Sequence, residues 1–325
     1  MVASPLVPVV VFLVGIGVVV WSVEEFVEHV AEAAVDLGVS AFLLTVVLAG
    51  IDLENAVLGV AAAAGDLPDV ALGTVFGEAL FILGAAVGLA GVAIPFETET
   101  PREYLALTAV SPALLGLLSL DGRLSRLDGL LLLVGFAPLL WVVYRREARR
   151  TTRYLEAEEA DEIEAEVREG SDAAGGDDRE LVELGVLLLT VVGMTAGSEL
   201  AVMGARDVLA AFDIAGLAFG ATVMSFVASL EEILLTVEPV RDGRPEVGVG
   251  NVVGSTLFFV TANAGVVALV HPLALSRTVF AVHWPFFLGS LALVLAFLSR
   301  GRVGRPEGAL LLAVYAGYWA ANYLL

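Results

Sequence analysis

Long apolar segments separated by short polar ones run along nearly the whole chain. Residues 6–21 and 130–143 are two examples, and a helix needs about 20 apolar residues to cross the hydrocarbon core of a bilayer. Apolar length, read against helix-breaking residues, predicts ten membrane-spanning helices. Their expected bounds are 5–33, 39–64, 68–93, 103–120, 125–144, 181–211, 215–239, 246–270, 278–299 and 306–324.

The pattern also repeats at long range. Residues 45–88 align with residues 222–265 without a gap, at a constant offset of 177. The matched pairs include Thr45/Thr222, Leu53/Leu230, Glu54/Glu231, Pro68/Pro245, Gly73/Gly250, Gly77/Gly254, Phe81/Phe258 and Gly88/Gly265. A duplication of this length is typical of transporters whose binding site lies where two halves meet. We predict a first repeat over residues 1–144 and a second over 181–325, with five spans in each.

Charge distribution predicts how the spans are oriented. Residues 145–180 are too charged for lipid and form the predicted linker, whose arginine-rich start places it in the cytoplasm. Counting spans outward from the linker puts both termini outside. Because each half holds an odd number of spans, the halves are inverted relative to each other. The expected fold is therefore an all-α, multi-pass protein of the inner (plasma) membrane, with two inverted five-helix repeats.

Composition narrows the possible partners. The 325 residues are 58% hydrophobic, with a mean hydropathy of +0.88, which predicts a protein embedded in the lipid bilayer. The net charge of −21, with arginine as the only strongly basic residue type, argues against nucleic acid as a partner. Cysteine is absent, which excludes disulfides and thiolate metal ligands. The acidic, arginine-containing and lysine-free composition resembles that of proteins from halophilic archaea.

Carboxylates interrupt the second span of each half, at residues 50–55 and 227–232, and more oxygen-bearing side chains follow in 73–78 and 250–255. A charged side chain at the centre of a bilayer costs about 3 kcal/mol, so these groups are expected to face a cation, a cavity or one another. Oxygen-only clusters suit hard cations. The candidate cation-binding residues are Glu232, Ser229, Glu231, Ser255, Asn251, Asp52, Glu54, Asn55 and Glu78, of which Glu232, Glu78, Glu54 and Asp52 are the expected metal-binding carboxylates.

Two of these segments carry a specific resemblance. Residues 221–233, containing Ser-Leu-Glu-Glu, and residues 250–255, Gly-Asn-Val-Val-Gly-Ser, resemble the second alpha-repeat of the calcium/cation antiporter superfamily, the sodium/calcium exchanger family. Residues 197–205 look like that family's sixth-helix signature, and residues 37–40 and 44–47 are similar to the approach to its first alpha-repeat. The resemblance implies that Glu232 occupies the position of an ion-binding glutamate, and that Ser229 and Ser255 occupy hydroxyl ligand positions.

The first repeat departs from the family pattern. Asn55 lies where the resemblance implies a glutamate, while Asp52 and Glu78 lie at serine positions. Ile82 and Phe259 replace polar residues that complete the family's site. The acids are thus relocated rather than simply lost. Crowded carboxylates in a medium of low dielectric also make the proton a candidate counter-ion.

The sequence therefore predicts a secondary active antiporter that exchanges Ca²⁺, or a related cation, for Na⁺ or H⁺ by alternating access. No cofactor is expected beyond the transported inorganic cations. The alternative is a transport-inactive or cation-sensing membrane protein on the same fold. We expect no enzyme activity, because no nucleophile motif, phosphate loop or metal-binding histidine pair occurs. His271 and His283 are expected at the membrane interface rather than as ligands.

Overall fold

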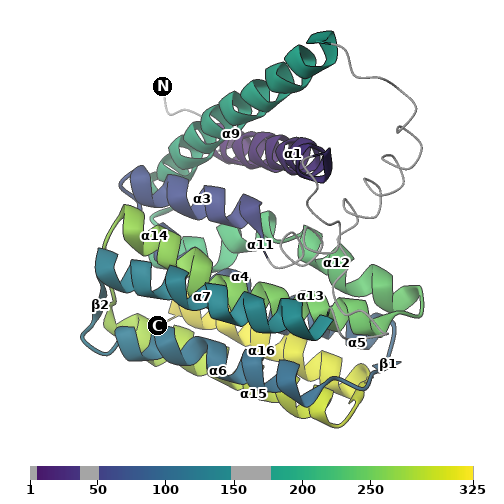
Figure 1. Ribbon diagram of the computed structural model, residues 1–325. Helices are drawn as coiled ribbons and strands as arrows, with labels where there is room; N and C mark the ends of the chain where they lie inside the picture. The colour runs from purple at the N-terminus through teal and green to yellow at the C-terminus, as the bar shows by residue number, and fades with distance from the viewer. Residues whose placement is uncertain (1–5, 37–50, 148–176, 325) are drawn as a thin grey trace.

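The computed structural model describes residues 6–36, 51–147 and 177–324, and helices make up most of this part of the chain (Figure 1). The elements of the first half are α1 (Leu6–Asp36), α3 (Leu53–Ala64), α4 (Pro68–Leu80), the π-helix η1 (Phe81–Ala86), α5 (Val87–Ala93), β1 (Phe96–Glu97), α6 (Arg102–Leu118), β2 (Arg123–Leu124) and α7 (Arg126–Glu147). Residues 39–50 of the second predicted span, and most of the predicted linker, lie outside the described residues.

The second half contains a matching series of helices. Its elements are α9 (Asp177–Phe212), α10 (Gly216–Phe219), η2 (Gly220–Met224), α11 (Ser225–Ala228), α12 (Glu231–Arg241), α13 (Pro245–Phe258), η3 (Phe259–Asn263), α14 (Ala264–Val270), β3 (Leu273–Ala274), η4 (Val279–His283), α15 (Trp284–Ser299), β4 (Arg302–Val303) and α16 (Arg305–Leu324). The repeated prolines mark equivalent helix starts. Pro68 opens α4 and Pro245 opens α13, where a missing N–H costs nothing.

Six helical segments among the described residues are long and apolar enough to cross a membrane. They are Leu6–Val30, Pro68–Ala93, Arg126–Arg146, Gly185–Phe212, Pro245–Val270 and Val279–Ser299. A seventh span is formed if Gly216–Ala228 and Glu231–Arg241 are counted together, although they are bent by 48°. The predicted span 215–239 thus corresponds to two bent helices, and the chain breaks at Ser229 and Leu230, within the interruption that the sequence shows at 227–232.

Two long helices, α1 and α9, pack chiefly against each other, and Figure 1 shows them together above α3. Glycines make this close contact possible. A Cβ atom at Gly15 would collide with the backbone of Ala201, and one at Gly204 would collide with the backbone of Phe12. Small residues let helix backbones approach in this way where no water drives association. The α1–α9 pair is thus a tightly packed unit beside the rest of the bundle.

The continuous segments 68–93 and 245–270 form the buried centre of the bundle, and most of their residues are inaccessible to solvent. Each contains a π-helical turn, η1 and η3, at an equivalent place in the duplication. Such wide turns inside α-helices frequently occur at functional sites. The duplication seen in the sequence therefore extends to this local departure from regular helix.

Contacts between the two halves hold the bundle together. Helix α5 packs on α16 at Gly88 and Gly308, and α14 packs on α7 at Gly265 and Gly129. Gly88 and Gly265 are a matched pair of the duplication, so the repeated glycine allows a close helix crossing in each half. Two short antiparallel strand pairs, β1–β4 and β2–β3, also join loops of different halves. The halves therefore interlock and are not spatially separate bodies.

Candidate cation-binding site

Two helices begin at equivalent positions beside the centre of the bundle. Helix α12 begins at Glu231 after the break, and α3 begins at Leu53 with Asp52 as its N-cap. In the alignment of the two repeats, at an offset of 177, Leu53 matches Leu230 and Glu54 matches Glu231. The N-terminus of a helix carries a partial positive charge, which stabilises nearby carboxylates. These helix starts explain how acids are accommodated inside an apolar bundle.

Asp52 and Asn55 form the first-half side of a buried polar centre. Asp52 Oδ1 accepts a hydrogen bond of 2.9 Å from the backbone N–H of Asn55, and Asp52 Oδ2 accepts another from Asn55 Nδ2. Asn55 Nδ2 also lies 3.3 Å from Ser229 Oγ in the break of the other half. Asn55 and Ser229 are almost completely buried. This contact joins two positions that are 174 residues apart in sequence.

Glu232 provides the second-half side of the same centre. Its Oε2 atom accepts a 2.6 Å hydrogen bond from Asn251 Nδ2, and the Ser255 hydroxyl is a further hydrogen-bond partner. Asn251 Nδ2 is also 3.4 Å from Thr236 Oγ1. The carboxylates of Asp52 and Glu232 lie beside each other. We call the group formed by Asp52, Asn55, Ser229, Glu232, Asn251 and Ser255 the central polar cluster.

Glu78 forms its hydrogen bond outside the central polar cluster, although the charges of Asp52 and Glu232 act on its carboxylate. Its Oε2 atom accepts a hydrogen bond of 2.7 Å from Asn263 Nδ2, and both residues are completely buried. Ile82 and Phe259, at positions where the sequence resemblance implies polar residues, are also completely buried. The buried acid is therefore held by an amide one turn beyond Phe259.

Glu54 and Glu231 occupy the periphery of this region. Both side chains are only partly buried. Glu54 lies within electrostatic reach of Asp52, Glu231 and Glu24, the last of which projects from α1. The matched acids of the duplication thus lie between the central polar cluster and the α1–α9 pair.

The structure brings together Asp52, Asn55, Ser229, Glu232, Asn251 and Ser255, and leaves Glu54, Glu231 and Glu78 around them. Within the described ranges, no group of three or more histidine, aspartate or glutamate side chains is placed to hold a metal ion. Carboxylates here are instead interleaved with amides and hydroxyls. Sequence reasoning missed Asn263 and Thr236. Asn263 could have been found, because it is an amide within the predicted apolar span 246–270.

His283 is enclosed by the helix bundle. Its side chain is completely buried, its Nδ1 atom is 2.7 Å from the Tyr318 hydroxyl, and its ring packs on Phe76. Packing of α15 against α16 and α4 covers the ring. Its interfacial depth stays a prediction, because His283 lies near the start of the apolar segment Val279–Ser299 and burial by neighbouring helices does not fix depth in the membrane.

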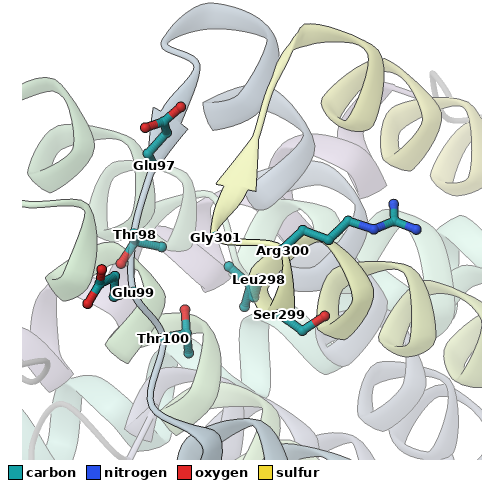
Figure 2. Close-up of a pocket in the computed structure, with 8 residues that line it drawn as sticks. All are labelled: Glu97, Thr98, Glu99, Thr100, Leu298, Ser299, Arg300 and Gly301. Carbon is teal, nitrogen blue, oxygen red and sulfur yellow. The ribbon is translucent and has the colours of Figure 1, made fainter.

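A surface depression of about 480 Å³ lies between the loop of β1 and the loop before β4. Figure 2 shows Glu97–Thr100 on one side and Leu298–Gly301 on the other, with Arg300 directed away from the Glu97–Thr100 segment. Its lining shares no residue with the central polar cluster. The candidate site is consequently the central polar cluster, most of whose side chains are buried, and not this open surface feature.

The fold and the buried cluster define a class: a multi-pass, all-α membrane protein with polar side chains gathered at a broken helix. The sequence profile of the sodium/calcium exchanger protein family matches residues 7–145 and 182–324. The chain belongs to that family.

Relatives and solved structures agree with this assignment. The chain is 28% identical over 333 residues to the putative antiporter CaxA of Alkalimonas amylolytica, covering 98% of this chain and 99% of CaxA. It is 26% identical over 325 residues to the inner membrane protein YrbG of Escherichia coli, covering 96% of each. A structure of the sodium-calcium exchanger NCX_Mj matches its fold with a TM-score of 0.59 at 22% identity, covering 98% of this chain and 99% of NCX_Mj. The names of CaxA, a putative antiporter, and of NCX_Mj, a sodium-calcium exchanger, describe transporters and not enzymes.

Proposed function

We propose that this protein is a secondary active antiporter that exchanges Ca²⁺, or a related cation, for Na⁺ or H⁺ by alternating access. The observation that carries the proposal is the central polar cluster, in which Asp52 and Asn55 of one half meet Ser229 and Glu232 of the other. Two neighbouring carboxylates in an apolar bundle are unfavourable unless a cation or a proton offsets their charge. A site at the junction of the halves is also suited to opening toward either side.

The proposed ligands are the oxygen atoms of the central polar cluster. Asp52 and Glu232 supply the charge, and the hydroxyls and amide carbonyls supply neutral oxygens, which is a donor set suited to Ca²⁺. Glu54 and Glu231, which are partly buried, then line the approach to the site, where their carboxylates attract cations. Asn251 has a positioning role, because its amide nitrogen holds the Glu232 carboxylate.

The proposed architecture has ten spans in two inverted repeats, over residues 1–144 and 181–325, joined by the cytoplasmic linker 145–180 in the plasma membrane, with both termini outside. Equivalent helix starts, equivalent π-helical turns and the paired Gly88 and Gly265 crossings support the duplication. The close α1–α9 packing supports movement of these two helices as one unit across the core.

Transport in proteoliposomes tests the proposal. We expect the purified wild-type protein to move ⁴⁵Ca²⁺ against its gradient when an outward Na⁺ or H⁺ gradient is imposed, and to stop when an ionophore dissipates that gradient. Protein-free vesicles provide the background. Absence of flux under both gradients would contradict the antiporter proposal.

One observation favours the second candidate, a cation-sensing protein on the same fold. Ile82 and Phe259 place apolar side chains where the family resemblance implies ligands, and both are completely buried. A sensor would be thermally stabilised by Ca²⁺ and yet show no gradient-driven flux. The same preparation therefore distinguishes the two functions.

Replacing Asn251 tests the positioning of Glu232. We expect Asn251→Ala to raise the Ca²⁺ concentration for half-maximal thermal stabilisation by about tenfold, because one charge-assisted hydrogen bond to the carboxylate is lost. Asn322→Ala is a matched control, since Asn322 lies on α16, outside the central polar cluster, and donates to the Tyr318 backbone carbonyl. An unchanged Ca²⁺ concentration for half-maximal thermal stabilisation in Asn251→Ala would contradict the role of Asn251 in the site.

A further inference from the structure

The last helix, α16, is attached to the first part of the broken span by a hydrogen bond between two hydroxyls. The Tyr323 hydroxyl lies 2.7 Å from Thr222 Oγ1 in the π-helical turn η2. The Thr222 hydroxyl donates its only proton to the Ala218 carbonyl, so Tyr323 is the donor and Thr222 Oγ1 the acceptor. Thr222 is completely buried, whereas Tyr323 is half-exposed and is the next-to-last residue of α16. The bond therefore joins an internal turn to the end of the last helix.

A ring contact one turn away adds to this attachment. Trp319 precedes Tyr323 by four residues, and Phe226 follows Thr222 by four residues. The rings of Trp319 and Phe226 pack edge to face, with 5.7 Å between their centroids. Because residues four apart lie on the same side of a helix, the two contacts form one seam between antiparallel segments. We call the pairs Tyr323–Thr222 and Trp319–Phe226 the α16 tether.

The tethered segment, α10–η2–α11, rests on α4 through small residues. A Cβ atom at Gly77 would overlap Ser225 Oγ, and one at Gly73 would overlap the backbone of Ala221. The Ser225 hydroxyl donates to the Gly220 carbonyl of its own segment and not to α4. Glycine surfaces give close van der Waals contact without interlocking side chains. The directional contacts of the α16 tether therefore fix how closely the segment lies on α4.

The tethered segment leads directly into the central polar cluster. Helix α11 ends at Ala228, and the next residue, Ser229, has its Oγ 3.3 Å from Asn55 Nδ2. The chain then bends by 48° into α12. A bend between two short helices lets one of them move while the other stays in place. Displacement of the segment from α4 would consequently move Ser229 and open that side of the cluster.

The tyrosine and the threonine of the tether both recur in the first half of the sequence. The duplication pairs the threonine with Thr45, which lies outside the described residues. Tyr323 matches Tyr144 at an offset of 179, the same offset that relates the helix starts Arg126 and Arg305. This recurrence in the sequence favours a role in the duplicated architecture over an incidental surface contact.

We propose that Tyr323 and Trp319 are positioning residues, which hold α10–η2–α11 closed on α4 and so set how often this side of the central polar cluster opens. This inference rests on the proposed alternating access, because it names a contact that must be released for one side to open. Loss of one hydrogen bond shifts an equilibrium severalfold. That is enough to change the open fraction while α16 itself stays folded.

Thiol labelling tests the tether, because the chain has no cysteine of its own. Ser225→Cys places a single thiol between α11 and α4, where Ser225 is completely buried. We expect Tyr323→Phe to raise the rate at which N-ethylmaleimide modifies this thiol in the purified protein by about fivefold, since phenylalanine keeps the ring and removes only the donor. Tyr144→Phe is the matched control. It should leave the rate unchanged, because α7 packs chiefly on α14.

A double substitution distinguishes the hydrogen-bonded pair from general loosening. Thr222→Val removes the acceptor and keeps the shape, so it should accelerate labelling of Ser225→Cys about as much as Tyr323→Phe does. The two substitutions together should accelerate labelling no more than either alone, because each removes the same bond. Ser111→Cys, at a buried position on α6, reports loosening of the whole bundle and should keep its rate in Tyr323→Phe.

Four results would overturn the tether: an unchanged rate in Tyr323→Phe, no labelling of Ser225→Cys in any variant, additive effects in the double variant, or an equal acceleration at Ser111→Cys. If the wild type exchanges Ca²⁺ and Tyr323→Phe labels at the unaltered rate, the tether fails and the antiporter stands. If labelling accelerates as expected and the wild type shows no gradient-driven flux, the tether stands and the antiporter fails.

Discussion

Replacing Glu232 with glutamine is expected to reduce gradient-driven Ca²⁺ uptake into proteoliposomes by on the order of 100-fold, equivalent to about 3 kcal/mol of lost interaction. Glu232 is one of the two carboxylates in the central polar cluster and is held by Asn251 at 2.6 Å. Glutamine keeps the shape of the side chain but removes the charge. Asp52 alone then has to neutralise a divalent cation in a medium of low dielectric, which weakens binding on both sides of the membrane.

The matched control for this substitution lies on the same helix. Glu238 is an exposed residue of α12, away from the cluster, and Glu238→Gln removes the same charge. We expect Glu238→Gln to transport at the wild-type rate. Size-exclusion profiles of both variants will test whether they are folded. Wild-type flux in a folded Glu232→Gln protein would contradict the assignment of Glu232 as a cation ligand.

The second large effect is expected from Gly220→Ala, which acts on folding. Gly220 lies in η2 where that helix crosses α4, and a Cβ atom there would overlap the backbone of Val70. Backbone cannot move aside as the end of a side chain does, so the two helices must separate. Overpacking of this kind costs roughly 1–3 kcal/mol. We expect a lower thermal unfolding midpoint and a lower yield of monodisperse protein in detergent.

Gly289→Ala provides the comparison, because its methyl group would project into open space. This variant should unfold at the wild-type temperature. A wild-type midpoint for Gly220→Ala would mean that the α4–η2 crossing tolerates a wider separation, and that the small residue there has another purpose.

Much of the fold could be predicted because its signals are local. Apolar length located the span 68–93 without error, and it located 246–270 to within one residue of the observed start. Pro68 and Pro245 are the first residues of α4 and α13. Proline lacks a backbone N–H and is therefore a signal for a helix start that can be read directly from the sequence. Sequence also singled out Glu232, Ser229, Asn251 and Asp52, since polar groups within an apolar span stand out, and the structure brings them together.

The rest depended on contacts between distant residues. The interruption at 227–232 was visible in the sequence, but the 48° bend between Gly216–Ala228 and Glu231–Arg241 was not. Burial of His283 under α4 and α16 could not be read from its distance to a span end. The division of the acids into a central polar cluster and a peripheral pair likewise required three dimensions.

Sequence alone was sufficient for the class of protein, for spans such as 68–93 and 246–270, and for the duplicated segments. Hydrophobic length and repeated glycine and proline positions can be read from consecutive residues. Only the tertiary structure decided which oxygens share a site. The partner of Glu78 is Asn263, 185 residues away, and Asn55 contacts Ser229, 174 residues away. Side-chain pairing across a helix bundle depends on crossing geometry and rotation about each helix axis, and these follow from the packing of the whole chain.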